Sequence, residues 1–293
     1  MLIFLLSIVL FFSPLVFMRY AKDAFSAPKN FMVFSVLSLI FLFFIFKLLY
    51  KKVSISKYPS LFISGIVMLS LLSCLYSVNA VVSLKFFIEW LLYMFLFFSV
   101  IDIIRKKRDI LIGFANIIIF SSLLVGILGI FQHFGLDYFG KITNFKGRIS
   151  STLGNANFLG GYLIMVIPVC LSMFLISRDI KRKVFYCFSL LLTVFNLLST
   201  QTLNAWISLV IAMVFFGIYY LLHYRKHLKK VVVVSCILLI FVSLFFAVFF
   251  PGEAVEKLKN FGKFENLAEQ GRWVMWRSAI EMIKEKPIFG FGA

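Results

Sequence analysis

The sequence predicts an all-α protein, a polytopic transmembrane helix bundle of about nine spans with an outward amphipathic helical tail. The 293 residues are 62% hydrophobic, with a mean hydropathy of +1.02. Apolar runs are separated by short clusters of Lys and Arg. A helix needs about 20 apolar residues to cross a bilayer, and run after run reaches that length. We therefore expect a membrane domain over 1–250 and the beginning of a large extracytoplasmic loop over 251–293.

Each predicted span is an apolar run bounded by polar or charged residues. The first run lacks a basic segment before it, so we expect a retained helix. The alternative is a signal peptide, because residues 24–27 resemble a cleavage site. The expected spans lie near 2–18, 31–50, 60–79, 86–104, 110–132, 158–176, 184–200, 204–222 and 231–250.

The basic clusters predict the orientation of these spans. They follow the second, fourth, sixth and eighth spans, at 47–57, 105–108, 178–183 and 225–230. Cytoplasmic loops of membrane proteins are enriched in Lys and Arg. The amino terminus is therefore expected in the cytoplasm, with 133–157, 200–204 and 251–293 outside. One loop disagrees, because Arg19, Lys22 and Lys29 lie in a segment that this orientation places outside.

The net charge of +18 does not indicate a nucleic-acid partner, because the basic residues border apolar spans and suit contact with anionic membrane lipids. The four cysteines stand singly in apolar runs, without the spacing of metal ligands or a disulfide framework. No motif for nucleotide binding, metal coordination or a serine nucleophile is present. We expect no cofactor and no metal site.

The first of three polar outward stretches spans 146–162. Its glycines and asparagines tolerate unusual backbone angles, and Arg148, Asn155, Asn157 and Tyr162 surround a helix start. Backbone N–H groups and the helix dipole attract anions at such a point. The stretch is a candidate site for phosphate or sugar hydroxyls; the alternative is an ordinary N-capped loop.

The second stretch, 199–206, is a polar hairpin that offers Gln201 and Asn204, although Ser, Thr and Asn are also usual turn residues.

The third stretch contains a predicted helix that Gly271-Arg272 opens and Pro287 ends. One side of this helix carries Trp273, Trp276, Ile280 and Ile283, and the other carries Arg277. An arginine at a helix start can hold a pyrophosphate through bidentate bonds. The alternative is an amphipathic helix on the membrane surface. His133 could reach an outward site, but a packed interfacial histidine is the favoured interpretation.

Taken together, these stretches resemble the O-antigen ligase and O-antigen polymerase family of bacterial envelope enzymes. The similarity lies in Arg148-x-x-Ser-Thr-x-Gly-Asn155-x-Asn157 followed by Tyr162, in the Thr200–Trp206 turn, and in Gly271-Arg272-x-x-x-Trp276 before Pro287-x-x-Gly290-x-Gly292. It covers roughly 140–293.

The resemblance implies metal-independent glycosyl transfer at the outer face of a bacterial plasma membrane, in polysaccharide or lipopolysaccharide assembly. The donor would be a polyprenyl-diphosphate-linked glycan and the acceptor a glycan or lipid-linked molecule. Arg148 and Arg272 would act in catalysis by steadying the diphosphate. Asn155, Asn157, Tyr162, Gln201, Asn204 and Arg277 would bind substrate.

The chain departs from the family pattern in two places. The usual arginine of the turn falls on Leu203, and Asn204 replaces the usual glycine. The resemblance also places the catalytic histidine and closing helices beyond Ala293, so we expect a truncated product. A non-catalytic remnant or assembly partner is therefore an alternative. A small-solute transporter is disfavoured, because no matching pair of Gly/Pro-interrupted spans is present.

Overall fold

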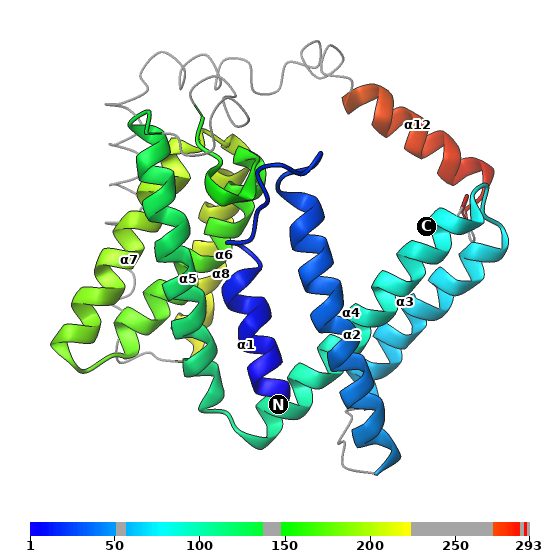
Figure 1. Cartoon of the computed structure of the whole chain (residues 1–293), viewed down its shortest axis with the longest axis horizontal. Coiled ribbons are helices and arrows are strands. Elements are labelled where there is room, and N and C mark those ends of the chain that lie inside the picture. The colour runs from blue at the N-terminus through cyan, green and yellow to red at the C-terminus, as the bar shows by residue number, and fades with distance from the viewer. Residues whose placement is uncertain (51–56, 137–147, 224–271, 288–289, 292–293) are drawn as a thin grey trace. The chain divides into compact units, whose positions relative to one another are not determined.

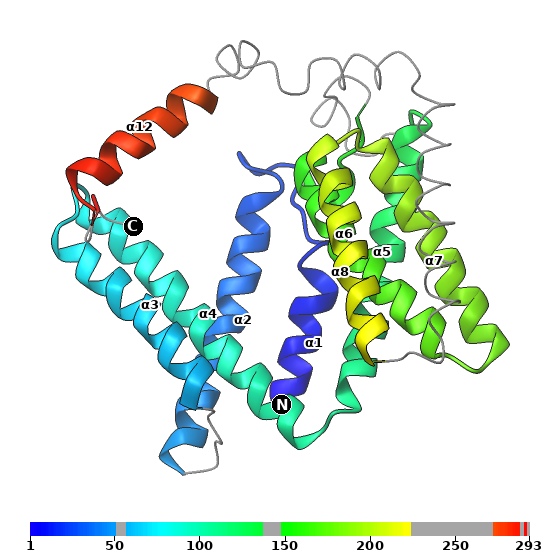
Figure 2. The ribbon, with the colours of Figure 1, turned by 180° about the vertical axis from the view of Figure 1, so that it is seen from behind.

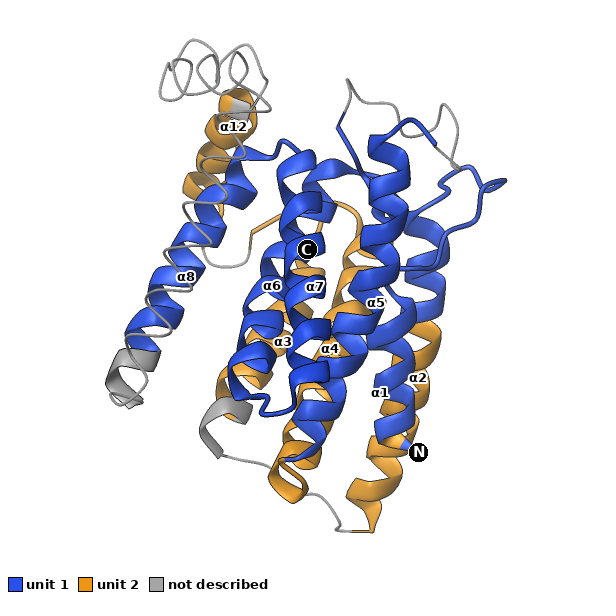
Figure 3. Cartoon of the chain, turned by 90° about the vertical axis from the view of Figure 1, so that its left-hand side faces the viewer, with its two compact units in different colours: residues 1, 3–33, 109–250 blue, residues 2, 34–108, 251–293 orange. Residues whose placement is uncertain are grey.

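The computed structural model describes residues 1–50, 57–136, 148–223, 272–287 and 290–291. The chain divides into two compact units (Figure 3). Unit 1 contains residues 1, 3–33 and 109–250, and unit 2 contains residues 2, 34–108 and 251–293. We describe each unit by itself.

Unit 1 is built from α1 (Leu2–Phe12), α5 (Ile110–His133), α6 (Ala156–Ile176), α7 (Ile180–Ser199) and α8 (Leu203–His223), with a short 3-10 turn at Ser151–Leu153 (Figures 1 and 2). Its core lies around α6, where Leu159, Leu163 and Ile167 are fully buried against apolar residues of α5, α7 and α8. The apolar periodicity of α6 therefore faces neighbouring helices as well as lipid.

The first helix is shorter than its sequence predicts. A span was expected over 2–18, but α1 ends at Phe12, with Ser13 as its C-cap. Pro14 has no backbone N–H to donate, although Ser13 before it keeps helical angles, with φ -54° and ψ -42°. Eleven residues rise roughly 17 Å, less than the ~30 Å hydrocarbon core. Residues 13–25 are consequently free to cross over one end of unit 1.

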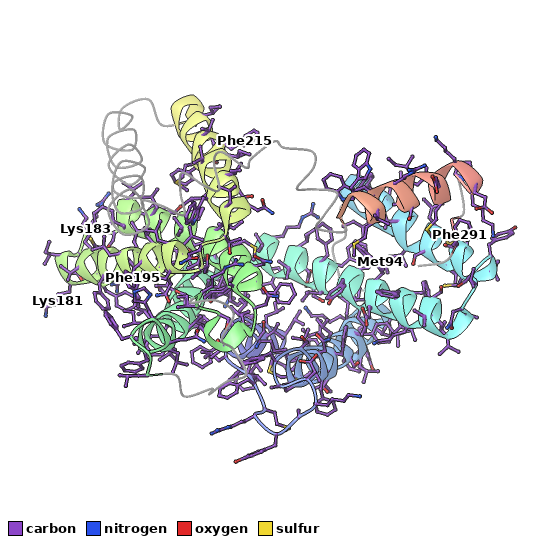
Figure 4. All side chains as sticks on the ribbon, turned by 90° about the horizontal axis from the view of Figure 1, so that it is seen from above. Met94, Lys181, Lys183, Phe195, Phe215 and Phe291 are labelled. Atoms are coloured by element: carbon purple, nitrogen blue, oxygen red, sulfur yellow. The ribbon has the colours of Figure 1, made fainter. Side chains whose placement is uncertain are left out.

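Unit 2 contains α3 (Lys57–Leu75), α4 (Ala80–Lys106) and α12 (Arg272–Glu285). The helix α2 (Ser26–Leu49) begins in unit 1 and continues into unit 2. Phe44 of α2 is buried and contacts Phe95 and Phe98 of α4, with ring centroids 5.5 and 6.2 Å apart. At the other end of the unit the backbone N–H of Val78 donates to the carbonyl of Phe291, which lies beside α12 (Figure 4).

The prediction of a polytopic helical membrane protein is confirmed. Five described helices are long and apolar enough to cross a membrane, namely α2, α4, α5, α6 and α7. Shorter apolar helices cover Leu2–Phe12, Leu61–Leu75 and Leu203–Tyr219. The predicted span at 231–250 lies outside the described residues. The predicted tail helix is confirmed as α12, which begins at Arg272 and stops before Pro287.

The two ends of unit 1 differ in chemistry. The carboxyl ends of α5 and α7 meet the amino ends of α6 and α8 at one end, where the polar stretches 148–157 and 199–204 lie. The turn between α6 and α7 lies at the opposite end and carries a basic cluster that includes Lys181 and Lys183 (Figure 4). The loop with Arg19, Lys22 and Lys29 also packs on the polar end, so basic residues occur at both ends of unit 1.

Candidate functional site

Arg148 joins the two polar stretches that the sequence singled out. Its Nε donates to the carbonyl of Thr200 at 2.8 Å, and its Nη2 donates to Thr202 Oγ1 at 2.8 Å and to Asn157 Oδ1 at 3.0 Å. The hydroxyl of Thr202 in turn donates to the carbonyl of Ala156 at 3.3 Å. We call Arg148, Asn157, Thr200 and Thr202 the Arg148 network. It ties the start of α6 to the α7–α8 turn.

The segment before α6 is held by side chains of α5. Gln132 Oε1 accepts from the backbone N–H groups of Ser150 and Ser151, both at 2.8 Å. The hydroxyl of Ser151 donates to the carbonyl of Val125 at 2.7 Å. Ser150, Ser151 and Thr152 are each at most 3% exposed, so buried polar atoms anchor this loop instead of leaving it in solvent. Its position is therefore fixed by the fold.

Asn155 is the N-cap of α6, and its Oδ1 accepts from the backbone N–H of Asn157 at 2.8 Å. The side chains of Asn155 and Asn157 are exposed, while that of Arg148 is half-buried. One guanidinium and two amides therefore border a helix amino end, where first-turn N–H groups attract anions. Tyr162 lies farther into α6, with its hydroxyl buried.

The turn between α7 and α8 is tighter than its sequence predicts. Gln201 has a φ of +50°, in the left-handed region, and α8 begins at Leu203. Asn204, which stands where the family pattern has glycine, is an exposed residue of the first turn of α8. The position that needs backbone freedom is therefore Gln201. This conformation directs the carbonyl of Thr200 toward Arg148.

The segment after α1 packs on the same end of unit 1. The hydroxyl of Thr152 donates to the carbonyl of Pro14 at 2.7 Å. Gly154 has a φ of +74°, and a Cβ there would lie 2.3 Å from the ring of Phe25, so only glycine fits. Lys29 donates from Nζ to the carbonyl of Thr152. Three residues that are distant in sequence thus enclose the 3-10 turn.

The local charge balance is positive. In the described segments 13–29, 148–157 and 199–204, four cations face the single carboxylate of Asp23, a net charge of +3. The Ser26 backbone N–H donates to that carboxylate and holds the pKa of Asp23 below its usual range, so the residue is ionised at neutral pH. The three hydrogen bonds of Arg148 given above go to a carbonyl, a hydroxyl and an amide oxygen.

Under this surface α5 and α7 approach closely. Asn196 Nδ2 donates to the carbonyl of Gly126 at 3.1 Å, and a Cβ placed on Gly129 would lie 1.9 Å from Asn196 Oδ1. His133 packs edge-on against Phe195, with ring centroids 5.2 Å apart, in line with the packed histidine that the sequence favoured. Among the described residues, no group of three or more His, Cys, Asp or Glu could hold a metal ion.

The remaining candidates belong to unit 2. Arg272 begins α12. Arg277 is exposed, and its Nε pairs with Glu281 Oε1 at 3.3 Å, one helical turn away. The apolar residues Trp273, Trp276, Ile280 and Ile283 are between 45% and 62% exposed. Arg148 belongs to unit 1, whereas Arg272 belongs with α12 to unit 2, which is orange in Figure 3.

Comparison with known proteins supports the resemblance to O-antigen ligases. The family model of the O-antigen ligases matches residues 188–293. We call these residues the O-antigen ligase region, after the family that they resemble. This region contains most of α7, the α7–α8 turn and α12, and therefore two of the three motifs on which the resemblance was based. Neither the curated proteins nor the solved structures contain a match to the chain.

Arg148 lies outside the O-antigen ligase region, but two of its hydrogen-bond acceptors, on Thr200 and Thr202, lie inside it. Sequence reasoning singled out Arg148 and missed Thr202, Gln132 and Lys29 as contributors to the site. Gln132 could have been noticed, because it is an amide at the end of an otherwise apolar helix. Lys29 was visible only as an exception to the charge pattern.

Proposed function

We propose that this chain transfers a glycan from a polyprenyl-diphosphate carrier to a glycan or lipid-linked acceptor at the outer face of the bacterial plasma membrane. The family match supports membrane glycan processing of the O-antigen ligase or polymerase type. The donor, the direction of transfer and the residues that act are our proposal. The Arg148 network is the part of the donor site that we assign to unit 1.

The proposal depends most on the bonding of Arg148. A cation outside the matched region is joined at 2.8 Å to the turn of that region and at 3.0 Å to an exposed amide at the amino end of α6. A purely structural arginine could satisfy the same acceptors. The exposed Asn155 and Asn157 beside it, together with the local net charge of +3 counted above, instead favour an anionic ligand carrying hydroxyl groups.

The chemistry needs charge stabilisation. An acceptor hydroxyl would attack the anomeric carbon of the donor sugar while the bond from that carbon to the diphosphate oxygen breaks. The hydroxyl proton passes to a base, and negative charge develops on the leaving diphosphate. A guanidinium already held in place stabilises that charge without further reorganisation. Asn155 and Asn157 would orient the sugar or the phosphate oxygens. Arg272 is a separate candidate for donor binding, from its place at the start of α12.

We also propose that the polar end of unit 1 faces outward and that the amino terminus is cytoplasmic. The support is the basic turn between α6 and α7 at the opposite end of the unit. In a background without native cysteines, Lys22→Cys should react with a membrane-impermeant thiol reagent in intact cells. Lys181→Cys should react only after permeabilisation. The reverse pattern would overturn this orientation.

The experiment on the site measures binding of a polyprenyl-diphosphate analogue to the full chain in nanodiscs. Arg148→Lys and Arg148→Met should each weaken binding by about 10- to 100-fold, because both remove the guanidinium that the network holds in place. Thr202→Val is the matched control. It removes one acceptor of the network at 2.8 Å but leaves the guanidinium and its charge.

The Thr202→Val control separates a role of Arg148 in ligand binding from a role in holding the turn. If Arg148 acts on the ligand, Thr202→Val should change affinity by only a few-fold. If Arg148 only braces the turn, both substitutions should lower the unfolding temperature and neither should change the affinity of the folded fraction. That second outcome would remove Arg148 from the donor site. Unchanged binding by Arg272→Ala would likewise remove Arg272.

A further inference from the structure

The loop that violates the predicted charge pattern packs on the same end of unit 1 as the candidate site. Arg19, Lys22 and Lys29 belong to a loop that the orientation places outside, where Lys and Arg are normally scarce. The structure packs this loop on the Arg148 end of unit 1, through the Thr152–Pro14 hydrogen bond and the contact of Phe25 with Gly154. The orientation rule does not explain these basic residues, so they need another cause. Attraction of an anionic ligand is one such cause.

Lys29 is the member of this set that the fold holds in place. It lies in the first turns of α2, is half-buried, and donates to the carbonyl of Thr152. Its Nζ also lies 5.7 Å from the centroid of the Phe25 ring. These partners are a neutral carbonyl and an aromatic face. Both stabilise an ammonium without neutralising it.

The nearby carboxylate is engaged elsewhere. Asp23 accepts from the backbone N–H groups of Ser26 at 2.8 Å and Phe25 at 3.2 Å, capping the start of α2. Within the part of the chain that the structure describes, Lys29 forms no ion pair, whereas Lys47 on the same helix pairs with Asp102 at 2.9 Å. Asp23 also attracts Lys29 electrostatically, but its carboxylate already accepts two backbone N–H groups. A half-buried ammonium whose direct contacts are a carbonyl and an aromatic ring is suited to receive an external anion.

The position of Lys29 also matches the ligand. Thr152, which it contacts, is three residues from Asn155, so their Cα atoms lie within about 11 Å of each other. A diphosphate has two phosphoryl groups, and binding both charges requires more than one cation. We propose that Lys29 binds the anionic diphosphate of the carrier lipid together with Arg148. This inference rests on the proposed function and adds a second cation to the same site.

The test uses the full chain in nanodiscs with a polyprenyl-diphosphate analogue. Lys29→Gln keeps a donor for the Thr152 carbonyl but removes the charge, and Lys29→Arg keeps the charge. The matched control is Lys22→Gln, which removes an exposed charge from the same loop. We expect Lys29→Gln to weaken binding about tenfold, the loss of roughly 1.4 kcal/mol, and Lys29→Arg to stay within a few-fold of the native chain. Lys22→Gln should have a small effect that disappears at high salt.

A second measurement does not depend on any variant folding. In the native chain the analogue should protect Lys29 from an amine-reactive reagent, while polyprenol without phosphate should not. Equal labelling with and without the analogue would overturn the proposal, as would native affinity in a folded Lys29→Gln. If the native chain binds no analogue, the proposed function itself fails. If Arg148→Met loses binding while Lys29→Gln keeps it, only the role of Lys29 fails.

Discussion

Arg148 in unit 1 and Asp102 in unit 2 are both charged residues of a helical membrane protein, but the groups that they contact differ. Arg148 is half-buried and donates to a carbonyl, a hydroxyl and an amide. Asp102 is only 1% exposed and lies between two ammonium groups, Lys47 at 2.9 Å and Lys106 at 2.7 Å. These three acceptors of Arg148 are neutral groups, whereas the two partners of Asp102 are both cations.

The difference separates a site suited to a ligand from a structural contact. Asp102, Lys47 and Lys106 join the carboxyl ends of α2 and α4, and the lysines also suit the negative end of each helix dipole. The Arg148 network joins the amino ends of α6 and α8 and keeps exposed amides beside the cation. We therefore expect substitutions around Asp102 to affect folding, and those at Arg148 to affect binding as well.

The largest predicted effect is that of Asp102→Asn. Removing one partner of a buried ion pair leaves the others uncompensated and typically costs about 3–5 kcal/mol. Here two lysines would remain against an amide, so the folded fraction in detergent should fall sharply. Thermal unfolding, followed by the loss of monodisperse protein, measures the change. Lys47→Met should cost less, because Lys106 still pairs with Asp102.

A combined variant tests the interpretation. In Asp102→Leu with Lys47→Met, charge and countercharge are replaced together, and such replacements of buried pairs are often neutral. Stability should recover most of what Asp102→Asn loses. If the single and the combined variants are equally unstable, packing at Asp102 matters more than its charge, and the contrast with Arg148 would weaken.

Features that depend on neighbouring residues could be predicted from the sequence. The spans followed from apolar length, and the limits of α12 followed from Arg272 and Pro287, because these signals act locally. The Asp102–Lys106 pair, four residues apart on one helix, could also be predicted. α1 was predicted too long because the apolar run continues past Phe12, where the helix ends.

The partners of the charged residues could not be predicted in the same way. Arg148 contacts Thr200 and Thr202, more than 50 residues away, and Lys29 contacts Thr152 across an even longer interval. A single sequence contains no pattern that pairs such positions. The sequence could thus name Arg148, Asn155 and Asn157 as candidates from their residue types, but it could not show that the α7–α8 turn shares their hydrogen bonds.

An intermediate effect is predicted for Gly129→Ala, which tests how rigidly the polar end of unit 1 is held. A Cβ at this position would lie 1.9 Å from Asn196 Oδ1 and 3.3 Å from Ile149 Cδ1. Overpacking of this kind typically costs about 1–3 kcal/mol. Because Ile149 adjoins Arg148, ligand affinity should also fall. The measurements are unfolding temperature and binding of the diphosphate analogue.

Gly113→Ala is the matched control for that prediction. Gly113 lies in the same helix, and a Cβ there meets nothing within 4 Å. Alanine should be neutral there or stabilise the helix by up to about 1 kcal/mol. If Gly129→Ala is equally harmless, the close approach of α5 to Asn196 is not required, and the loop at 148–155 is held less tightly than we infer.

The smallest effect is predicted at Gln201, which has a φ of +50° in the turn that directs the Thr200 carbonyl toward Arg148. A left-handed conformation costs an L-residue roughly 1–2 kcal/mol, a strain that glycine avoids while losing more chain entropy on folding. Gln201→Gly should therefore change stability by less than about 1 kcal/mol and preserve binding of the diphosphate analogue. Gln201→Val should destabilise the turn and weaken binding, because a β-branched residue tolerates this φ poorly.

Asn204→Gly, at the position where the family pattern has glycine, should instead be mildly destabilising, since residue 204 is helical. Unfolding temperatures of the three variants rank these costs. A gain in stability or binding from Asn204→Gly with none from Gln201→Gly would mean that the turn bends at 204, and that Arg148 is positioned differently from the network described above.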